Sequence, residues 1–177
     1  MKLVLVSLLT LLVASFAQAE TRVYRDGDFV KAAINDSADA AALYDALSLE
    51  EFKGRSGTSK MFKTADGKAE VYCSKSSIPN GMPYVCTVAL NVKKNKKVKT
   101  TTMVYLDEGT WRASINAPSE SKALYDALNI KEFEGRSGYA RVYQTADLFA
   151  EIYCTESKLP VGLKNGCTVS IVLPKEQ

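Results

Sequence analysis

Apolar and polar positions alternate along the first part of the chain, and the pattern then changes to a helical one. Within residues 22–34, apolar and polar side chains alternate before and after the segment Asp-Gly-Asp at residues 26–28, which predicts two strands joined by a turn. Residues 40–47 place apolar side chains at positions i, i+3, i+4 and i+7, which predicts a short helix with one apolar face. We expect Asp36 or Ser37 to cap the start of this helix.

Three further strands are predicted after the helix, over residues 60–64, 69–74 and 84–92. Asp66-Gly67 is predicted to form a two-residue hairpin turn between the first two of these strands. The segment Gly54-Arg55-Ser56-Gly57 interrupts the pattern after the helix, and we expect Gly54 to end the helical region in a left-handed conformation. One helix with several antiparallel strands is typical of the α+β class.

The whole pattern occurs a second time. Residues 102–173 align with residues 21–92 at a constant offset of 81 without a gap, and 32 of the 72 aligned pairs are identical. We therefore expect two tandem repeats of about 80 residues, residues 20–97 and 98–177, each near the lower size limit for a core of its own. A single pseudo-symmetric body that shares one core is the predicted arrangement.

Two of the differences between the copies affect the predicted helix start and turn. Ser119 follows Pro118 at the start of the second predicted helix, and we expect Ser119 to cap it. Leu148 takes the place of the glycine in the Asp66-Gly67 turn, so the second turn is expected to have a different shape.

The two copies follow each other closely. The predicted strand at residues 84–92 continues through a lysine-rich segment into an apolar run at residues 98–106, and no segment rich in Pro, Ser or Gly lies between. We expect a hairpin at this junction, and the sheet of one copy could continue into the other.

The first 19 residues have the features of a secretory signal peptide. Lys2 provides the positive start, residues 3–16 are mainly apolar, and Ala17-Gln18-Ala19 fits the cleavage rule, so the mature chain is expected to begin at Glu20. No other stretch approaches 18 apolar residues, and no transmembrane segment is predicted. The expected location is the periplasm or the extracellular medium.

Export determines how the four cysteines are interpreted. In an oxidising compartment they predict two disulfides, with three possible connectivities. An ancestral single copy had to pair its own cysteines, so the duplication favours Cys73–Cys86 and Cys154–Cys167. Each pair has Cys-x12-Cys spacing and the chain has no histidine, which disfavours a metal site. No cofactor is expected.

The absence of histidine also restricts catalysis, because it removes Ser-His-Asp and Cys-His machinery. Residues 119–122, Ser-Glu-Ser-Lys, resemble the Ser-x-x-Lys nucleophile motif of penicillin-recognising serine enzymes, but the companion motifs Ser-Asp-Asn and Lys-Thr-Gly are missing. The carboxylates present in both copies are expected to pair with arginine or to be solvated. They are Asp45, Asp126, Glu70 and Glu151. We predict that the protein is not an enzyme. The alternative is a hydrolase-type enzyme with a carboxylate or lysine site between the repeats.

The Gly-Arg-Ser-Gly segment is the main candidate for a binding site, since both copies keep it intact. Its candidate residues are Arg55, Ser56, Arg136 and Ser137. Backbone N–H groups and a guanidinium could together hold a ligand. The favoured alternative is a chain reversal in which Arg55 pairs with Glu51 or Asp45, because glycine and serine are common in turns.

A second candidate is the lysine-rich segment between the copies, which contains Lys93, Lys94, Lys96 and Lys97. It could contact a polyanion or envelope surface, or it could be a solvated hairpin tip. The formal net charge of the whole chain is only +3, which gives no global reason to expect a specific nucleic-acid partner.

Aromatic residues supply the last candidates. Trp111 and Tyr139 replace Val30 and Thr58 of the first copy, and such side chains are common in binding hot spots, although local packing explains them equally well. The tyrosines kept in both copies are expected to lie in or near the core. They are Tyr24, Tyr44, Tyr72, Tyr105, Tyr125 and Tyr153.

These observations predict an exported, non-enzymatic binding module, with a protein as its partner. The layout of two tandem repeats of this size with one disulfide each resembles that of secreted bacterial enzyme inhibitors such as the β-lactamase inhibitory proteins. This resemblance implies an inhibitor of an extracellular or periplasmic enzyme.

Overall fold

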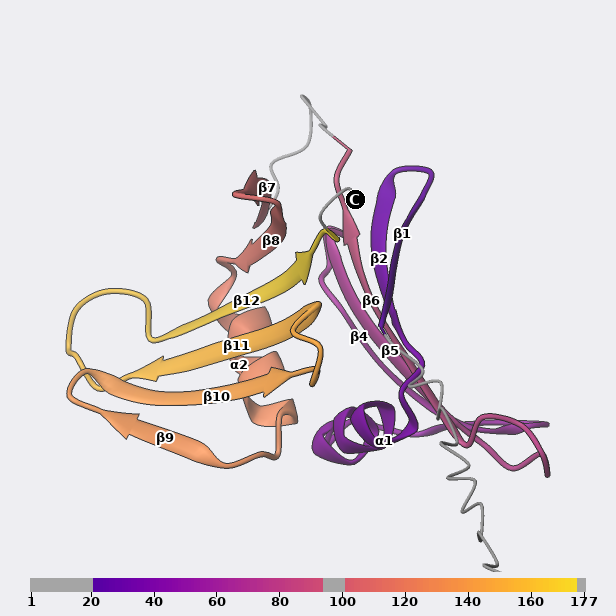
Figure 1. Cartoon of the computed structure of the whole chain (residues 1–177). Helices are drawn as coiled ribbons and strands as arrows, with labels where there is room; N and C mark the ends of the chain where they lie inside the picture. The colour runs from indigo at the N-terminus through magenta and orange to yellow at the C-terminus, as the bar shows by residue number, and fades with distance from the viewer. Residues whose placement is uncertain (1–20, 94–100, 175–177) are drawn as a thin grey trace, which may run out of the picture.

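A computed structural model describes residues 21–93 and 101–174 of the chain (Figure 1). The expected signal peptide, residues 1–19, lies outside the described residues. The first half contains β1 (Arg22–Asp26), β2 (Phe29–Ile34), α1 (Ser37–Ala46), β3 (Phe52–Gly54), β4 (Gly57–Lys63), β5 (Ala69–Ser76) and β6 (Tyr84–Asn91). The second half contains β7 (Thr102–Asp107), β8 (Thr110–Ile115), α2 (Pro118–Ala127), β9 (Glu132–Gly135), β10 (Gly138–Gln144), β11 (Ala150–Ser157) and β12 (Asn165–Val172).

The strands form two antiparallel sheets of six strands each. Their orders are β1-β2-β6-β5-β4-β3 and β7-β8-β12-β11-β10-β9, so the two halves have the same topology. Figure 1 shows α1 beside the first sheet and α2 behind the strands of the second. The predicted α+β class with two repeat-like halves is confirmed.

Alternating side chains give each sheet a helix-facing side and an outer side. In β5, Ala69, Val71 and Cys73 are buried beneath α1, whereas Glu70 and Tyr72 lie on the outer side. The helix contributes the fully buried Leu43 to the same core. The helices have only ten residues, so this packing, and not intrinsic propensity, must hold them.

Both predicted disulfides are present. Cys73 is bonded to Cys86 across β5 and β6, and Cys154 is bonded to Cys167 across β11 and β12. Each pair is directly in register between neighbouring strands and lies under the helix of its half. The Sγ atom of Cys86, for example, lies 3.3 Å from the carbonyl oxygen of Ala40 in α1.

The two halves meet along a seam whose contacts are reciprocal. At the ends of the helices, Leu47 and Leu128 form an antiparallel bridge. The N–H of Ser48 donates to the carbonyl of Ala127 at 2.7 Å, and the N–H of Asn129 donates to the carbonyl of Ala46 at 2.7 Å. The buried core is continuous across both halves. The arrangement is thus an internal pseudo-twofold.

Side chains at equivalent positions complete the seam. Asp39 of α1 accepts from the N–H of Ala146 at 2.8 Å, and its counterpart Glu120 of α2 accepts from the N–H of Ala65 at 2.5 Å. One contact has no counterpart: the hydroxyl of Tyr143 donates to the carbonyl of Asp39 at 2.9 Å, and Phe62 occupies the position of Tyr143 in the first half.

Several local predictions are wrong. The sheet does not continue across the junction, since β6 and β7 belong to different sheets. The Asp66-Gly67 turn is a longer loop closed by a bond from the N–H of Gly67 to the carbonyl of Thr64. The second copy has the same loop, because Leu148 adopts a φ of 66°, close to the 64° of Gly67.

The helix starts differ from each other. Asp36 caps α1 as predicted, because its Oδ1 accepts from the N–H groups of Ala38 and Asp39 at 2.9 Å each. Ser119 does not cap α2. The N-cap position is Ala117, which has no capping side chain, and Pro118 already occupies the first turn.

Candidate functional site

A hollow on the outer side of the sheet occurs at the same place in each half. In the first half it lies between the β3–β4 hairpin and the loop that follows β5. In the second half it lies between the β9–β10 hairpin and the loop that follows β11. The volumes are about 320 Å³ in the first half and about 460 Å³ in the second. We call these two cavities the outer hollows.

Small residues form the floor of each outer hollow, and aromatic residues form its walls. In the first half, Ser59 and Ser74 lie between Phe52 and Tyr72. Phe52 is 54% exposed and Tyr72 is 38% exposed, so both rings are available for contact.

The outer hollow of the second half is built in the same way. Ala140 and Thr155 replace the two serines of the floor, and Phe133 and Tyr153 form the walls. The loops add Ile78 to the first hollow and Leu159 to the second. The linings also include charged side chains, Lys75 in the first hollow and Glu134 and Glu156 in the second.

The Gly-Arg-Ser-Gly segments form the rim of the outer hollows. The prediction that Gly54 ends the helical region is wrong, because α1 ends eight residues earlier and β3 intervenes. Residues 55 and 56 form a tight turn between β3 and β4. Gly57 passes so close to β5 that a Cβ atom would lie 1.9 Å from the carbonyl oxygen of Lys75. Gly57 is therefore required by packing.

The serine and arginine of this segment have different roles. The carbonyl of Ser56 accepts from the N–H of Ser77 at 2.8 Å, and the carbonyl of Ser137 accepts from the N–H of Lys158 at 2.9 Å. These bonds tie the turn to the neighbouring loop. Arg55 is exposed, and within residues 21–93 and 101–174 it forms no ion pair, as is also true of Arg136. The predicted pairing of Arg55 with Glu51 or Asp45 is wrong, since Glu51 faces Lys60 at 3.9 Å.

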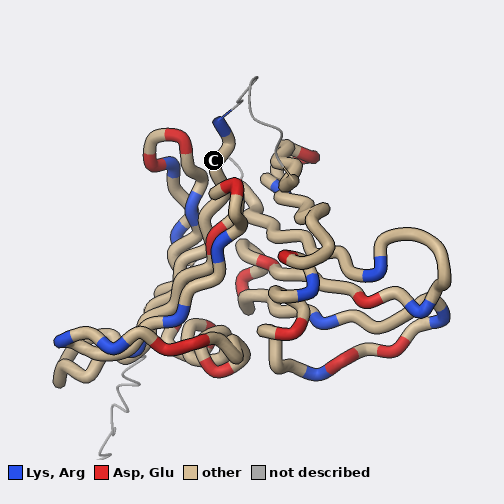
Figure 2. Tube along the Cα trace, turned by 180° about the vertical axis from the view of Figure 1, so that it is seen from behind, with Lys and Arg blue, Asp and Glu red and all other residues tan. Residues whose placement is uncertain are grey.

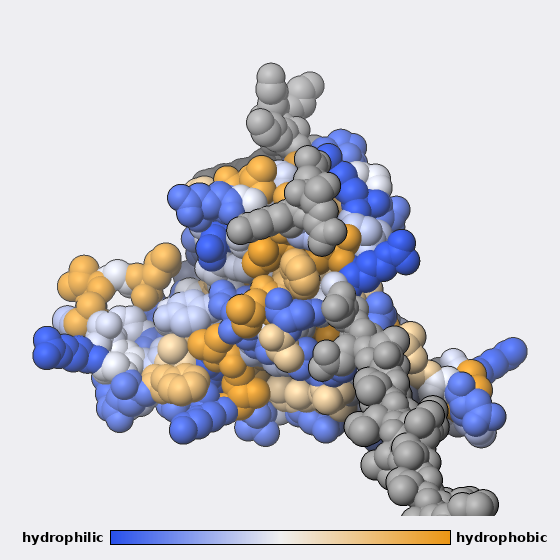
Figure 3. Space-filling model, viewed as in Figure 1, coloured by the Kyte–Doolittle hydropathy of each residue, from blue (hydrophilic) through white to orange (hydrophobic). Residues whose placement is uncertain are grey.

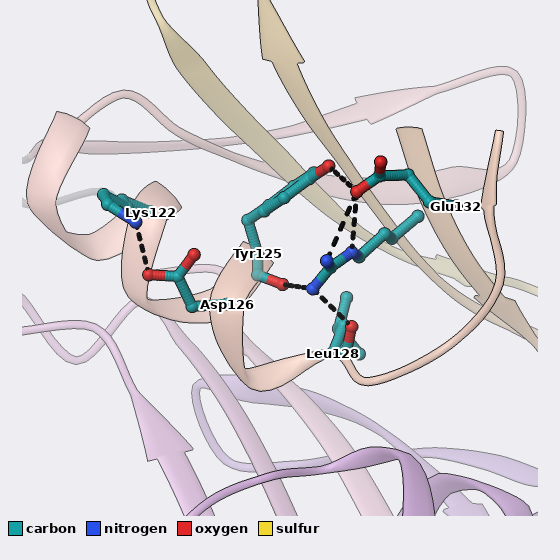
Figure 4. A network of polar contacts seen from close by, with 6 residues as sticks. Lys122, Tyr125, Asp126, Leu128 and Glu132 are labelled. Atoms are coloured by element: carbon teal, nitrogen blue, oxygen red, sulfur yellow. Dashed lines mark hydrogen bonds and ion pairs between the residues drawn. The ribbon is translucent and has the colours of Figure 1, made fainter. Parts of the chain in front are cut away.

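A polar network at the end of α2 is shown in Figure 4. The guanidinium of Arg141 donates to the carbonyls of Tyr125 and Leu128 at 3.0 and 2.9 Å and lies 3.2 Å from a carboxylate oxygen of Glu132. The Tyr125 hydroxyl donates to Glu132 at 2.5 Å. Burial, followed by the Glu132 carboxylate, raises the pKa of Tyr125 to about 12. The phenol therefore stays neutral at physiological pH.

This network stabilises the carboxyl end of α2. A cation at the carboxyl end of a helix satisfies free carbonyls and interacts favourably with the helix dipole. In the first half, Lys60 Nζ donates to the carbonyl of Tyr44 at 3.0 Å in the same way. The replacement of lysine by arginine explains the larger number of bonds in the second half.

The carboxylates that both copies keep are not brought together as an acid–base pair. Glu70 pairs with Lys63 at 3.3 Å, and Asp126 pairs with Lys122 at 2.5 Å (Figure 4). Glu151 accepts from Gln144 at 3.3 Å. In the described part of the chain, no group of three or more acidic, cysteine or histidine residues could hold a metal ion. No helix there is long and apolar enough to cross a membrane.

The remaining candidate residues are placed as follows. Trp111 and Tyr139 are half-buried against the core, and Tyr139 also lines the second outer hollow. Lys93 is exposed and pairs with Asp28 at 2.8 Å. The other candidate lysines, Lys94, Lys96 and Lys97, lie outside the described residues.

Sequence reasoning missed the aromatic walls of the outer hollows. Tyr44 and Tyr125 are buried as predicted, but the other paired tyrosines are exposed on the outer sides of the sheets. They are Tyr24, Tyr72, Tyr105 and Tyr153. The signal that could have placed Tyr72 outside is that it alternates with the buried Val71 and Cys73. Phe52 and Phe133 are identical in the two copies, and this identity is the signal that could have indicated them.

The chain matches no protein-family model, and neither a curated protein nor a solved structure matches it significantly. The resemblance in layout to the β-lactamase inhibitory proteins therefore stays a prediction. The structure establishes the class, an α+β protein of two halves with one disulfide within each half. Its two disulfides are compatible with a compartment outside the cytoplasm.

Proposed function

We propose that this chain is an exported, non-enzymatic binding module that holds a protein partner through its two outer hollows. The observation that carries the proposal is the occurrence of the same hollow, with aromatic walls and a small-residue floor, in both halves. Buried aromatic anchors provide much of the energy in protein interfaces, and Phe52 and Phe133 are exposed at the required places.

The scaffold suits this role because its binding surfaces are fixed before a partner arrives. The disulfides join the strands beside each outer hollow, and the Ser56 and Ser137 carbonyls hold the rims to the adjacent loops. A rigid surface loses little conformational entropy on binding. Two similar surfaces on one body also allow bivalent contact, which raises the overall affinity.

The finer proposal is that the partner is an extracellular or periplasmic enzyme and that binding inhibits it. The first outer hollow is lined by no carboxylate, and of the two carboxylates that line the second, Glu134 and Glu156, the first is paired with Lys158. No metal site is found among the described residues, and capture of a partner needs no chemistry from this chain. The carboxylate alternative is disfavoured because Glu70 is paired with Lys63.

The test compares Phe52→Ala and Phe133→Ala with Leu106→Ala. Leu106 is 53% exposed, as Phe133 is, but it lies on β7 and lines neither outer hollow. The wild type is used to capture a partner from envelope extract, and dissociation constants are then measured with the purified pair. We expect each phenylalanine variant to weaken binding at least tenfold and the control to bind as the wild type does.

Two results would contradict the proposal. One is a partner that binds the double phenylalanine variant as tightly as the wild type. The other is turnover of a peptidoglycan, peptide, ester or glycan substrate that Glu70→Gln or Glu151→Gln abolishes in a folded protein. The second result would favour the hydrolase alternative.

A further inference from the structure

The loop between β11 and β12 exposes an unusually apolar tip. Residues 158–164 read Lys-Leu-Pro-Val-Gly-Leu-Lys. Val161 is 84% exposed, Leu159 is 58% exposed and Leu163 is 57% exposed. Single exposed apolar residues are common, but three within five positions of one loop form a patch that indicates an interaction.

The loop is held in a defined shape and projects from the body. The N–H of Ser157 donates to the carbonyl of Lys164 at 2.6 Å, which closes the base of the loop. The N–H of Leu159 donates to Oγ of Ser157 at 3.1 Å. Figure 1 shows the loop at the far end of the second sheet, and Figure 3 shows its hydrophobic surface at the edge of the molecule.

Cations surround the base of this tip. Lys158 and Lys164 flank it in the sequence, and the hydrogen bond between Lys158 and Ser137 places Arg136 of the β9–β10 turn beside it. Lys158 also pairs with Glu134. Within residues 157–165 there is no acidic side chain, and Glu156 lies directly before the loop on β11. Figure 2 shows the same arrangement, with cationic segments at the base of an otherwise uncharged loop.

The first half provides an internal comparison. Its loop also exposes apolar side chains, since Ile78 is 58% exposed and Met82 is 52% exposed. However, Ser77, Asn80 and Pro83 stand at the positions of Lys158, Val161 and Lys164. The second copy thus has an additional apolar side chain at the tip and a cation on each side of it.

We infer that the loop of residues 158–164 docks the protein on the surface of an anionic phospholipid bilayer. Leu159, Val161 and Leu163 enter the boundary between headgroups and acyl chains, and Lys158, Lys164 and Arg136 contact headgroup phosphates. The excess of cations, three against the carboxylates Glu134 and Glu156, favours this occupant over a protein. Protein interfaces also use about 20–30 residues on each side, many more than this loop offers, whereas a bilayer needs no complementary pocket.

The inference can be tested apart from the proposed function at Val161 and Leu163, which line neither outer hollow, whereas Leu159 also lines the second. The experiment measures co-sedimentation of the exported, processed protein with vesicles of phosphatidylglycerol and phosphatidylcholine, and with vesicles of phosphatidylcholine alone. The variants are Val161→Asp, Leu163→Asp, and Lys158→Ser with Lys164→Ser. The matched control is Met103→Asp, since Met103 is 59% exposed on β7 and distant in the chain from the loop.

We expect the wild type to partition onto the anionic vesicles and to be released by salt, because surface charges are screened. Each aspartate variant should lower the partition coefficient at least tenfold, and each lysine should account for about a fivefold effect. Met103→Asp should change it less than twofold. Val161→Asn, which introduces the residue of the first copy, should give an intermediate loss.

Several outcomes would overturn the inference. They are equal sedimentation with neutral and anionic vesicles, no sedimentation with either, and aspartate variants that bind as the control does. If Val161→Asp instead abolished capture of the protein partner while the wild type ignored vesicles, the loop would be a protein contact. Loss of vesicle binding with intact partner binding would support the inference and leave the proposed function unaffected.

Discussion

The backbone N–H of Thr21 donates a hydrogen bond of 2.7 Å to Oδ2 of Asp147, and this bond joins the start of the first half to the β10–β11 loop of the second. The same bond exists in the opposite direction, from the N–H of Thr102 to Oδ2 of Asp66 at 2.8 Å. Each aspartate also accepts from its own loop, at Lys68 and at Phe149. The seam is thus fastened at two equivalent carboxylates.

These carboxylates predict acid sensitivity. Burial raises the pKa of Asp66 and of Asp147, but their hydrogen bonds together outweigh burial and hold each pKa below the ordinary 3.8. Because each pKa is lower in the folded than in the unfolded state, the stabilisation is fully present above about pH 4 to 5. It is lost as the pH falls below that range.

We expect Asp66→Asn and Asp147→Asn each to lower the free energy of unfolding at pH 7 by about 1.5–3 kcal/mol, the usual contribution of a charged hydrogen bond. The difference from the wild type should shrink at pH 3. Urea denaturation at both pH values provides the measurement. A difference that is the same at pH 3 and pH 7 would show that the charges do not act through the seam.

Leu148 predicts a stabilising substitution. It adopts a φ of 66°, which costs a residue with a Cβ roughly 1–2 kcal/mol, whereas Gly67 at the same place adopts 64° without that cost. Leu148 is 57% exposed, so little packing is lost on its removal.

We therefore expect Leu148→Gly to raise the free energy of unfolding by about 0.5–1 kcal/mol, after allowance for the greater freedom of glycine in the unfolded chain. Gly67→Leu should lower it. The denaturation midpoint at a constant m-value is the readout. A destabilised Leu148→Gly variant would mean that the side chain makes contacts that exceed its backbone strain.

Gly138 predicts a destabilising substitution with a close control. A Cβ atom there would lie 2.0 Å from the carbonyl oxygen of Glu156, whereas a Cβ atom at Gly135 would meet nothing nearer than 3.7 Å. Gly138→Ala should cost at least about 2 kcal/mol, because β10 must move away from β11. Gly135→Ala should change stability by less than about 0.5 kcal/mol. The measurement is the thermal unfolding midpoint of both variants. Equal midpoints would contradict the prediction that the close packing of Gly138 matters for stability.

The lysine-rich segment remains a prediction from the sequence. Replacement of Lys93, Lys94, Lys96 and Lys97 by Ser should change the free energy of unfolding by no more than about 0.5 kcal/mol per site, since Lys93 makes an exposed ion pair. Binding of the wild type to heparin, a test polyanion, should weaken in the variant, with a smaller dependence on salt. Unchanged heparin binding would remove this segment as a polyanion site.

The offset between the copies was sufficient to pair the cysteines and to divide the chain into two equivalent halves, because it compares each residue with a counterpart. Binary patterning located most strands, since side chains in strands alternate between two faces. It failed at β3, which has three exposed residues and no apolar alternation. The prediction that the paired tyrosines lie in or near the core failed at Tyr72 for a related reason. Tyrosine is amphipathic, and the sequence alone does not show which face of the sheet is covered.

The seam was beyond the reach of sequence patterns. Asp39 and Asp66 look like ordinary helix and turn residues, and their partners Ala146 and Thr102 contribute only backbone N–H groups, which every non-proline residue has. The outer hollows likewise depend on tertiary structure, since Phe52 meets Tyr72 only when β3, β4 and β5 are neighbours. Only their duplication was visible in advance.

The bridge between Leu47 and Leu128 has a consequence for assembly. Because the contacts across the seam are hydrogen bonds and packing, and each disulfide lies within one half, the first half of one molecule can meet the second half of another with the same bonds that it makes within its own chain. The seam therefore determines how a first half packs on a second half, but it does not determine whether both halves belong to the same chain. In a concentrated solution, exchanged dimers would have the fold of two monomers and would differ from them in which chain supplies each half.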